Sequence, residues 1–138
     1  MDANQEAFHT LSYYTLSHPD KGYFIHQHIV DAYQAQIATE FSKPISILYA
    51  LVGLYLFLEK GYTGRQVQLA HMQLSRNKQP GPQLPLPVLR GTVSIEDVLL
   101  LPEGNIRDKG IRDWCQSVWD AYLPCHKAVA DFVTKQSV

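Results

Sequence analysis

A chain of 138 residues is long enough to close one hydrophobic core without disulfides or a structural metal, so we expect a single domain spanning residues 1–138. Its 12 basic and 13 acidic residues give a net charge of -1 without a lysine or arginine block, which argues against a nucleic-acid-binding protein. The two cysteines, Cys115 and Cys125, are too few for a secreted disulfide scaffold and lack CxxC spacing, which favours reduced thiols in a cytoplasmic protein.

Two helices are predicted on either side of a first turn. Residues 3–17 place apolar side chains near one helical face, and "HPDKG" at residues 18–22 interrupts them with turn residues. A second helix is predicted from about residue 23 to residue 39 and contains the segment "FIHQHIVDAYQAQ". The N-terminal "MDANQEAF" has no charged region before an apolar stretch, so we expect no secretory signal.

The third helix is predicted to lie in the core. It begins at Pro44, which suits a first helical turn, and it ends at Gly61. The apolar run from Ile45 to Leu58 covers 14 positions. Because a bilayer span needs about 20 apolar residues, this run predicts a buried helix and no membrane segment.

After a fourth helix the chain changes in character. That helix is predicted between Thr63, whose hydroxyl can cap it, and Asn77. The next segment, "KQPGPQLPLPVLRG", contains four prolines, so we expect it to cross the surface without regular helix. Its PxxP resembles an SH3 ligand, but no well-placed basic residue completes the pattern, which favours a simple crossover.

Two more helices complete the predicted fold. "TVSIEDVLLL" predicts a short helix capped by Ser94 or Thr92, and the last helix is predicted from about Arg107 to Lys135 with a kink at Pro124. The chain is therefore predicted to be all-α, a bundle of four or five helices with a proline-rich crossover between the fourth helix and the last helices. The residues expected to share one core are Tyr49, Leu56, Val67, Leu74, Trp114, Val118 and Tyr122.

The polar residues of the second helix form the first candidate site. His26 and His28 lie two positions apart, so on a helix they point in different directions and cannot share a metal ion. His28 and Asp31 lie three positions apart on one face, which is the geometry that metal sites in helical bundles employ. Gln36 lies further along the same helix.

Two other histidines extend this hypothesis. His71 and His126 lie on apolar stripes of other helices, so we expect both to face the core. Together with His28 and Asp31 they would offer three imidazoles and a carboxylate, which suit Zn²⁺, Ni²⁺ or Fe²⁺. If the site is catalytic, the metal would activate a water with Asp31 as ligand or base. The alternatives are a buried hydrogen-bonded network without metal, or exposure of these groups to solvent.

Two arginines indicate a second class of site. Arg65 lies at a helix N-terminus, where free backbone N–H groups favour an anion, and Arg90 would approach the same end. The alternative is that they make surface salt bridges or capping contacts. The candidate residues for binding a small anionic ligand are His28, Asp31, Gln36, Arg65 and Arg90.

Several segments resemble an uncharacterised bacterial protein family, a domain of unknown function. They are "FIHQHIVDAYQAQ", "KPISILYALVGLYLFLEKGYTGRQVQLAHM", "LPVLRGTVSIEDV" and "IRDWCQSVWDAY". The resemblance implies a bacterial cytoplasmic protein and supplies no activity or catalytic residue. The leading hypothesis is therefore a small-ligand or metal-binding pocket around His28 and Asp31. The competing hypothesis is a non-enzymatic structural or interaction module, for example a homodimer formed through its aromatic-rich helices.

Overall fold

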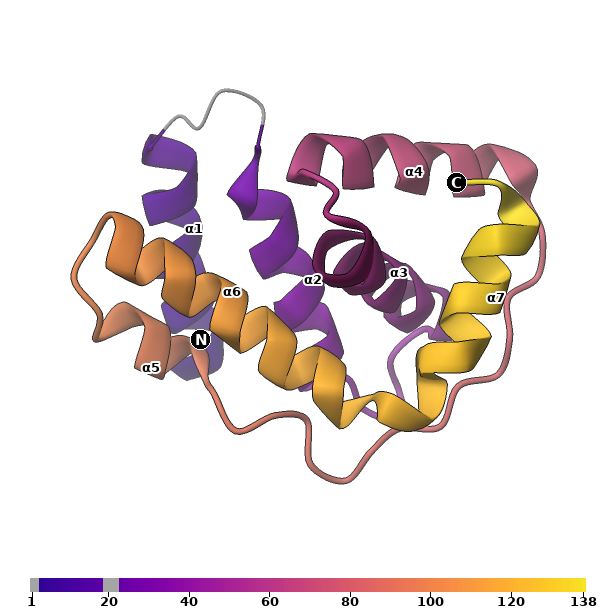
Figure 1. The fold of residues 1–138 in the computed structure, drawn as a ribbon. Helices are drawn as coiled ribbons and strands as arrows, with labels where there is room; N and C mark the ends of the chain where they lie inside the picture. The colour runs from indigo at the N-terminus through magenta and orange to yellow at the C-terminus, as the bar shows by residue number, and fades with distance from the viewer. Residues whose placement is uncertain (1–2, 19–22) are drawn as a thin grey trace.

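The computed structural model describes residues 3–18 and 23–138, and within these residues the regular secondary structure is entirely helical. The prediction of an all-α fold is confirmed, whereas the predicted count of four or five helices is wrong, because the described residues form seven α-helices (Figure 1). These are α1 (Ala3–Ser17), α2 (Ile25–Ile37), α3 (Pro44–Lys60), α4 (Gly64–Asn77), α5 (Ile95–Leu99), α6 (Asn105–Ala121) and α7 (His126–Gln136), with one 3₁₀ turn, η1 (Leu123–Cys125), before α7.

Helix α3 lies at the centre of the fold and contacts α2, α4, α6 and α7 (Figure 1). Its apolar residues are spread around the whole helix, so it is stable only when other helices cover it on several sides. Its buried residues are Ile47, Leu48, Ala50, Leu51, Val52, Gly53, Leu54 and Leu56. In the part of the chain that the structure describes, no helix is both long enough and apolar enough to span a bilayer.

Local signals end α3 and begin α4 where the sequence predicts. Helix α3 stops at Gly61, whose φ of 72° lies in the left-handed region that glycine adopts without strain. Thr63 Oγ1 accepts a hydrogen bond from Gln66 N (3.1 Å), and Gln66 Oε1 accepts one from Thr63 N (2.8 Å), which forms a capping box. Gly64 N then donates to Tyr23 O, so this corner is joined to the start of α2.

The predicted last helix is two helices. Helix α6 ends at Ala121, and α7 leaves it at a sharp angle after the turn that contains Pro124 (Figure 1). Proline has no N–H to donate, and its ring clashes with the carbonyl one turn earlier. The predicted kink is therefore a complete break, so the six helical segments that the sequence predicts become seven helices in the described residues.

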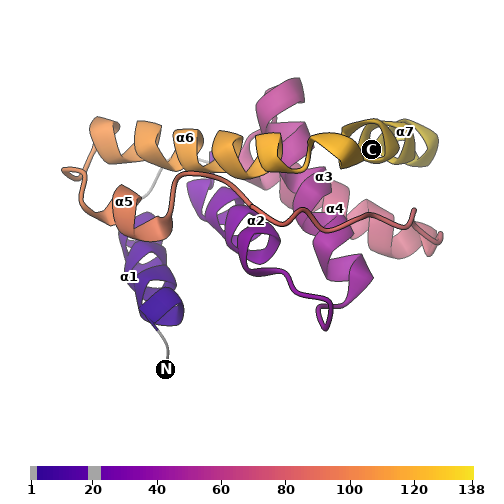
Figure 2. The same ribbon diagram turned by 90° about the horizontal axis from the view of Figure 1, so that it is seen from below.

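The segment between α4 and α5 contains neither helix nor strand from residue 79 to residue 94, and it runs alongside α7 and α6 (Figure 2). Side chains of the helices hold it in place. Ser117 Oγ accepts hydrogen bonds from Thr92 N (2.7 Å) and Val93 N (3.2 Å), and Cys125 Sγ donates to Pro85 O (3.4 Å). These contacts replace the regular backbone pairing that prolines prevent.

One hydrophobic core joins the helices. The prediction that Leu56, Val67, Leu74, Trp114, Val118 and Tyr122 are buried together is confirmed. Tyr49 differs, since it is partly buried and packs against the edge of this core.

Candidate functional site

Helix α2 carries two buried polar side chains, His28 and Asp31, each 3% exposed. It contacts α1, α3, α4 and α6, so little of its surface reaches solvent. His26 points toward α1, where its Nδ1 lies 3.1 Å from Thr15 Oγ1, and burial lowers its pKa. As predicted, His26 and His28 face different parts of the molecule.

The ring of His28 lies at the junction of three helices. It stacks on the ring of Phe57 from α3, with centroids 3.6 Å apart and planes 11° apart. Its backbone oxygen accepts a weak hydrogen bond from the thiol of Cys115 on α6, at 3.6 Å. The imidazole is thus fixed by stacking against an aromatic neighbour.

The carboxyl group of Asp31 lies between α2 and α3. Oδ1 accepts a hydrogen bond from Gln27 Nε2 at 3.1 Å, whereas Oδ2 has no hydrogen-bond partner among the described residues. The carboxyl fits only because residue 53 is glycine, since a Cβ on Gly53 would lie 1.8 Å from Asp31 Oδ2. The close approach of α2 and α3 therefore depends on this Asp31 and Gly53 pair.

Burial favours the neutral form of the ionisable groups in this region. It raises the pKa of Asp31 well above its ordinary value, and the hydrogen bond from Gln27 opposes that rise only in part. Burial also raises the pKa of the Cys115 thiol, and the nearby Asp31 adds to the effect. Because a nucleophilic cysteine needs its thiolate, Cys115 fits a structural role.

A pocket of about 430 Å³ opens beside His28, where the beginning of α2, the end of α3 and the first turns of α6 meet. Ligand sites in proteins typically measure roughly 300 to 1,000 Å³. Its apolar walls are formed by Tyr23, Ile25, Phe57, Tyr62 and Ile111. We call it the His28 pocket.

Three charged residues of α6 also line the His28 pocket, and they differ in their partners. Lys109 Nζ lies 3.1 Å from Asp113 Oδ2, and Asp108 Oδ1 accepts a hydrogen bond from the Tyr14 hydroxyl at 2.8 Å. The Arg112 guanidinium lies over the Phe57 ring, 5.1 Å from its centroid. Arg112 has no ion pair or hydrogen bond with any residue that the structure describes, so its charge is available to a ligand.

The other two predicted metal ligands lie elsewhere. His71 Nε2 is 2.9 Å from Tyr49 O, and His126 Nε2 is 2.7 Å from Trp119 O. Each imidazole also stacks on the aromatic ring of the residue whose carbonyl it contacts. Across residues 3–18 and 23–138, no three His, Cys, Asp or Glu side chains gather closely enough to hold a metal ion. A metal site that joins His71 and His126 to the pair on α2 therefore stays a prediction.

Gln36 joins the segment before α5 to α2 and α6. Its Nε2 donates to Arg90 O (3.2 Å) and Val93 O (2.9 Å), and its Oε1 accepts from Trp114 Nε1 (2.9 Å). Burial raises the pKa of Tyr122 to about 12, and the nearby charge of Arg90 opposes that rise. Gln36 is thus engaged with the protein itself, whereas the Nε of Arg90 is buried without a hydrogen-bond partner among the described residues.

Arg65 is exposed at the start of α4, where its Nη1 donates to Gln68 Oε1 at 3.3 Å. The pocket beside His28 is lined by neither Arg65 nor Arg90, and Gln36 lies outside it as well. Of the predicted ligand-binding residues, His28 lines the pocket, and Asp31 lies one turn along α2 from it.

Sequence reasoning missed Phe57 and Arg112 as site residues. Phe57 belongs to a continuous apolar run, so periodicity assigns it to the core. Arg112 is followed by Asp113 and resembles an ordinary surface charge. One signal in the sequence could have found Arg112. Ile111 belongs to the buried face of α6, so its neighbour Arg112 lies at the border of that face.

Fold and site together define an all-helical protein with a ligand-sized pocket at a junction of three helices. The model of a family of unknown function, DUF5946, matches residues 4–123, and the chain belongs to this family. The resemblance to an uncharacterised family is therefore confirmed. Searches of curated proteins and of solved structures found no significant match.

Proposed function

We propose that the protein binds a small organic anion in the His28 pocket. The observation that carries this proposal is the guanidinium of Arg112, which lies over Phe57 at an apolar-walled pocket and makes no ion pair with a described residue. Arginine presents a planar fork of N–H donors that matches a carboxylate, and it is weakly hydrated. The ligand would place its anionic group on Arg112 and its apolar body inside the pocket.

The electrostatics of the pocket favour an anion. The charge of Lys109 is offset by Asp113, and the carboxylate of Asp108 is turned toward the hydroxyl of Tyr14. Asp31, one turn beyond His28, is shifted toward its neutral form, so it does not add a full negative charge beneath the ligand. Among the described residues that line the pocket, Arg112 is the cation without an ion pair.

An organic anion is better supported than the metal ion of the initial hypothesis. Among the described residues no three His, Cys, Asp or Glu side chains are grouped so that they could hold a metal ion, and catalytic zinc sites use three protein ligands. The ring of His28 stacks on Phe57 and forms part of an apolar wall. Such a wall suits the body of an organic molecule.

The test uses two probes that differ in charge, 2-naphthoate and 2-naphthalenemethanol. Each is titrated into ¹⁵N-labelled protein and followed by two-dimensional NMR. We expect 2-naphthoate to shift the amide signals of Phe57, Tyr62 and Ile111, which line the pocket. Arg112→Gln should weaken 2-naphthoate about ten-fold or more, since a charge-assisted hydrogen bond is lost. It should leave the affinity for the uncharged alcohol unchanged.

The matched control is Arg76→Gln, which removes an exposed arginine in the last turn of α4. This variant should bind 2-naphthoate as the wild type does. The proposal is wrong if 2-naphthoate leaves the pocket amides unshifted, or if Arg112→Gln binds it with unchanged affinity.

A further inference from the structure

The first turns of α6 contain an ion pair that is expected from the sequence and is not formed. Asp108 and Arg112 lie four residues apart, with the acid first, which is the favourable order for an ion pair along a helix. Lys109 and Asp113 have the same spacing in the less favourable order, yet they pair at 3.1 Å. No ion pair joins Asp108 to Arg112 in the described part of the chain, and Asp108 accepts a hydrogen bond from another group instead.

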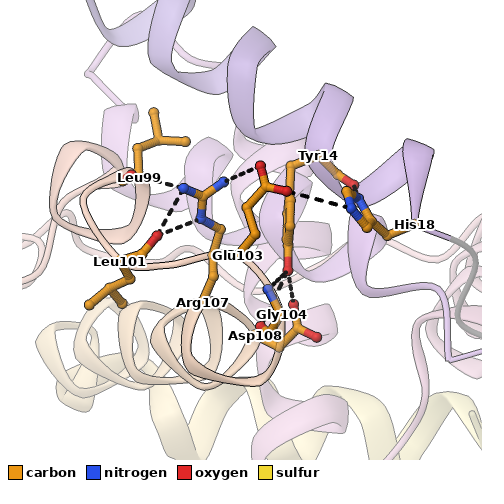
Figure 3. A network of polar contacts seen from close by, with 8 residues as sticks. All are labelled: Tyr14, His18, Leu99, Leu101, Glu103, Gly104, Arg107 and Asp108. Atoms are coloured by element: carbon orange, nitrogen blue, oxygen red, sulfur yellow. Dashed lines mark hydrogen bonds and ion pairs between the residues drawn. The ribbon is translucent and has the colours of Figure 1, made fainter.

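Tyr14 of α1 is that group (Figure 3). Its hydroxyl donates to Asp108 Oδ1 at 2.8 Å, and it accepts a hydrogen bond from Gly104 N at 3.0 Å. Burial and the hydrogen bond to Asp108 both raise the pKa of Tyr14, which keeps the phenol protonated and able to donate. A neutral donor thus engages Asp108 and leaves the charge of Arg112 unpaired.

Arg107 also lies beside Tyr14, and its guanidinium is engaged by other groups (Figure 3). Its Nη2 donates to Leu99 O and Leu101 O, both at 2.9 Å, and its Nη1 lies 3.8 Å from Glu103 Oε2. Its guanidinium covers the ring of Tyr14, 4.8 Å from the centroid. Arg107 therefore packs the phenol in position without competing for Asp108.

We propose that Tyr14 is a positioning residue for the anion site and acts through Asp108 to keep Arg112 free. This inference rests on the proposed function of the His28 pocket. Without the Tyr14 hydroxyl, Asp108 would turn toward Arg112 and compete with the ligand for the same guanidinium. Tyr14 lies on α1, outside the pocket lining, so it affects anion affinity without touching the ligand.

Tyr14→Phe tests the proposal in the full chain. We expect it to weaken 2-naphthoate about two- to five-fold, which corresponds to the strength of an exposed ion pair, and to leave the affinity for 2-naphthalenemethanol unchanged. In an Asp108→Asn background the competing ion pair cannot form, so Tyr14→Phe should no longer weaken 2-naphthoate. Tyr13→Phe, one position away and 76% exposed, is the control and should bind as the wild type does.

A second measurement needs no ligand. The Nε–Hε NMR signal of Arg112 should shift in Tyr14→Phe because an ion pair forms, and it should return to its wild-type position when Asp108→Asn is added. An unchanged signal in Tyr14→Phe would overturn the inference even if the pocket binds anions.

The binding results separate the two proposals. If the wild type does not bind 2-naphthoate in the pocket, the proposed function fails and the inference fails with it. If the wild type binds and Tyr14→Phe binds equally well, only the inference is overturned. Weakening of both probes, or equal weakening in the Asp108→Asn background, would show that Tyr14 merely shapes the pocket, and would also overturn it.

Discussion

The corner that joins α1 to α6 differs from the contact between α2 and α3 in whether its polar side chains have hydrogen-bond or ion-pair partners. At the corner, the side chains of Tyr14, Arg107 and Glu103 each have hydrogen-bond or ion-pair partners (Figure 3). Between α2 and α3, Asp31 is buried and one of its carboxyl oxygens has no partner among the described residues. The hydrogen bonds of the corner fix the position of α1 on α6. Between α2 and α3, the packing must leave room for the buried carboxyl of Asp31.

This difference predicts how strongly substitutions in each region affect the stability of the protein. A buried carboxyl with incomplete hydrogen bonding costs stability, and its neutral form is favoured. A partnered polar group contributes modestly, because its hydrogen bonds in the folded chain replace hydrogen bonds to water in the unfolded chain. We therefore expect the largest effects at Asp31 and Gly53, and the smallest at Tyr14.

Gly53→Ala should have the largest effect. The added Cβ would overlap Asp31 Oδ2, so we expect the free energy of unfolding to fall by about 3 kcal/mol, measured by urea unfolding. In an Asp31→Ala background the carboxyl is gone, and the same substitution should cost much less. Equal costs in the two backgrounds would show that the Asp31 carboxyl is not what requires a glycine.

Gln36→Met should cost about 2 kcal/mol of unfolding free energy. It leaves Trp114 Nε1 and the carbonyls of Arg90 and Val93 without their hydrogen bonds while nearly preserving side-chain volume. Gln34→Met, an exposed position of the same helix, is the control and should change stability little. Similar costs in thermal or urea unfolding for both variants would contradict a structural role for the Gln36 hydrogen bonds.

Asp31→Asn should change how stability depends on pH. As pH rises above 3.8, the ordinary pKa of the carboxyl, the unfolded wild-type chain loses the Asp31 proton while the folded chain retains it. The wild type therefore loses stability until pH passes the higher folded-state pKa, and below both pKa values the contribution is constant. The free energy of unfolding of the variant relative to the wild type should increase across this window, by at most about 1.4 kcal/mol per pH unit.

Urea unfolding at a series of pH values from about 3.5 to 8 measures this difference. A difference that does not vary with pH would mean that Asp31 has similar pKa values in the folded and unfolded states. Asp31 would then not differ in this respect from the partnered side chains of the corner between α1 and α6.

Tyr14→Phe should have the smallest effect on stability, a loss of about 1 kcal/mol, because it removes one hydroxyl with its hydrogen bonds to Asp108 and Gly104 and keeps the aromatic ring. Tyr13→Phe should leave the thermal midpoint unchanged, since that side chain is exposed. If Tyr14→Phe lowered the free energy of unfolding by more than about 3 kcal/mol, the corner would be as sensitive as the contact between α2 and α3. The distinction between the two regions would then be wrong.

Much of the fold could be predicted because its signals are local. The hydroxyl of Thr63 and the side chain of Gln66 form their capping box within one turn, and Gly61 ends α3 through its own backbone. The number of helices could not be predicted in the same way. Pro124 permits either a kinked helix or two helices, and the packing of α7 against α3 favours the second.

For the candidate site too, local features could be predicted from the sequence and contacts between helices could not. The spacing of His28 and Asp31 placed both on one face of a helix and left burial and exposure to solvent as alternatives, and the structure buries both side chains. The same reasoning placed His71 and His126 toward the core, where each is half-buried and contacts a backbone carbonyl. An apolar stripe predicts which face of a helix points into the core, but it does not predict which of the inward-facing side chains contact one another.

By itself, the sequence determined the all-helical character, most helix ends, and the common helix face of His28 and Asp31, because 3.6-residue spacing and capping act over one or two turns. Only the tertiary structure decided that Asp31 lies against Gly53 and that Phe57 and Arg112 meet beside His28. These contacts join residues of different helices, so they depend on how the helices cross. The free guanidinium of Arg112 arises in this way, since a tyrosine on α1 engages the acid that would otherwise neutralise it.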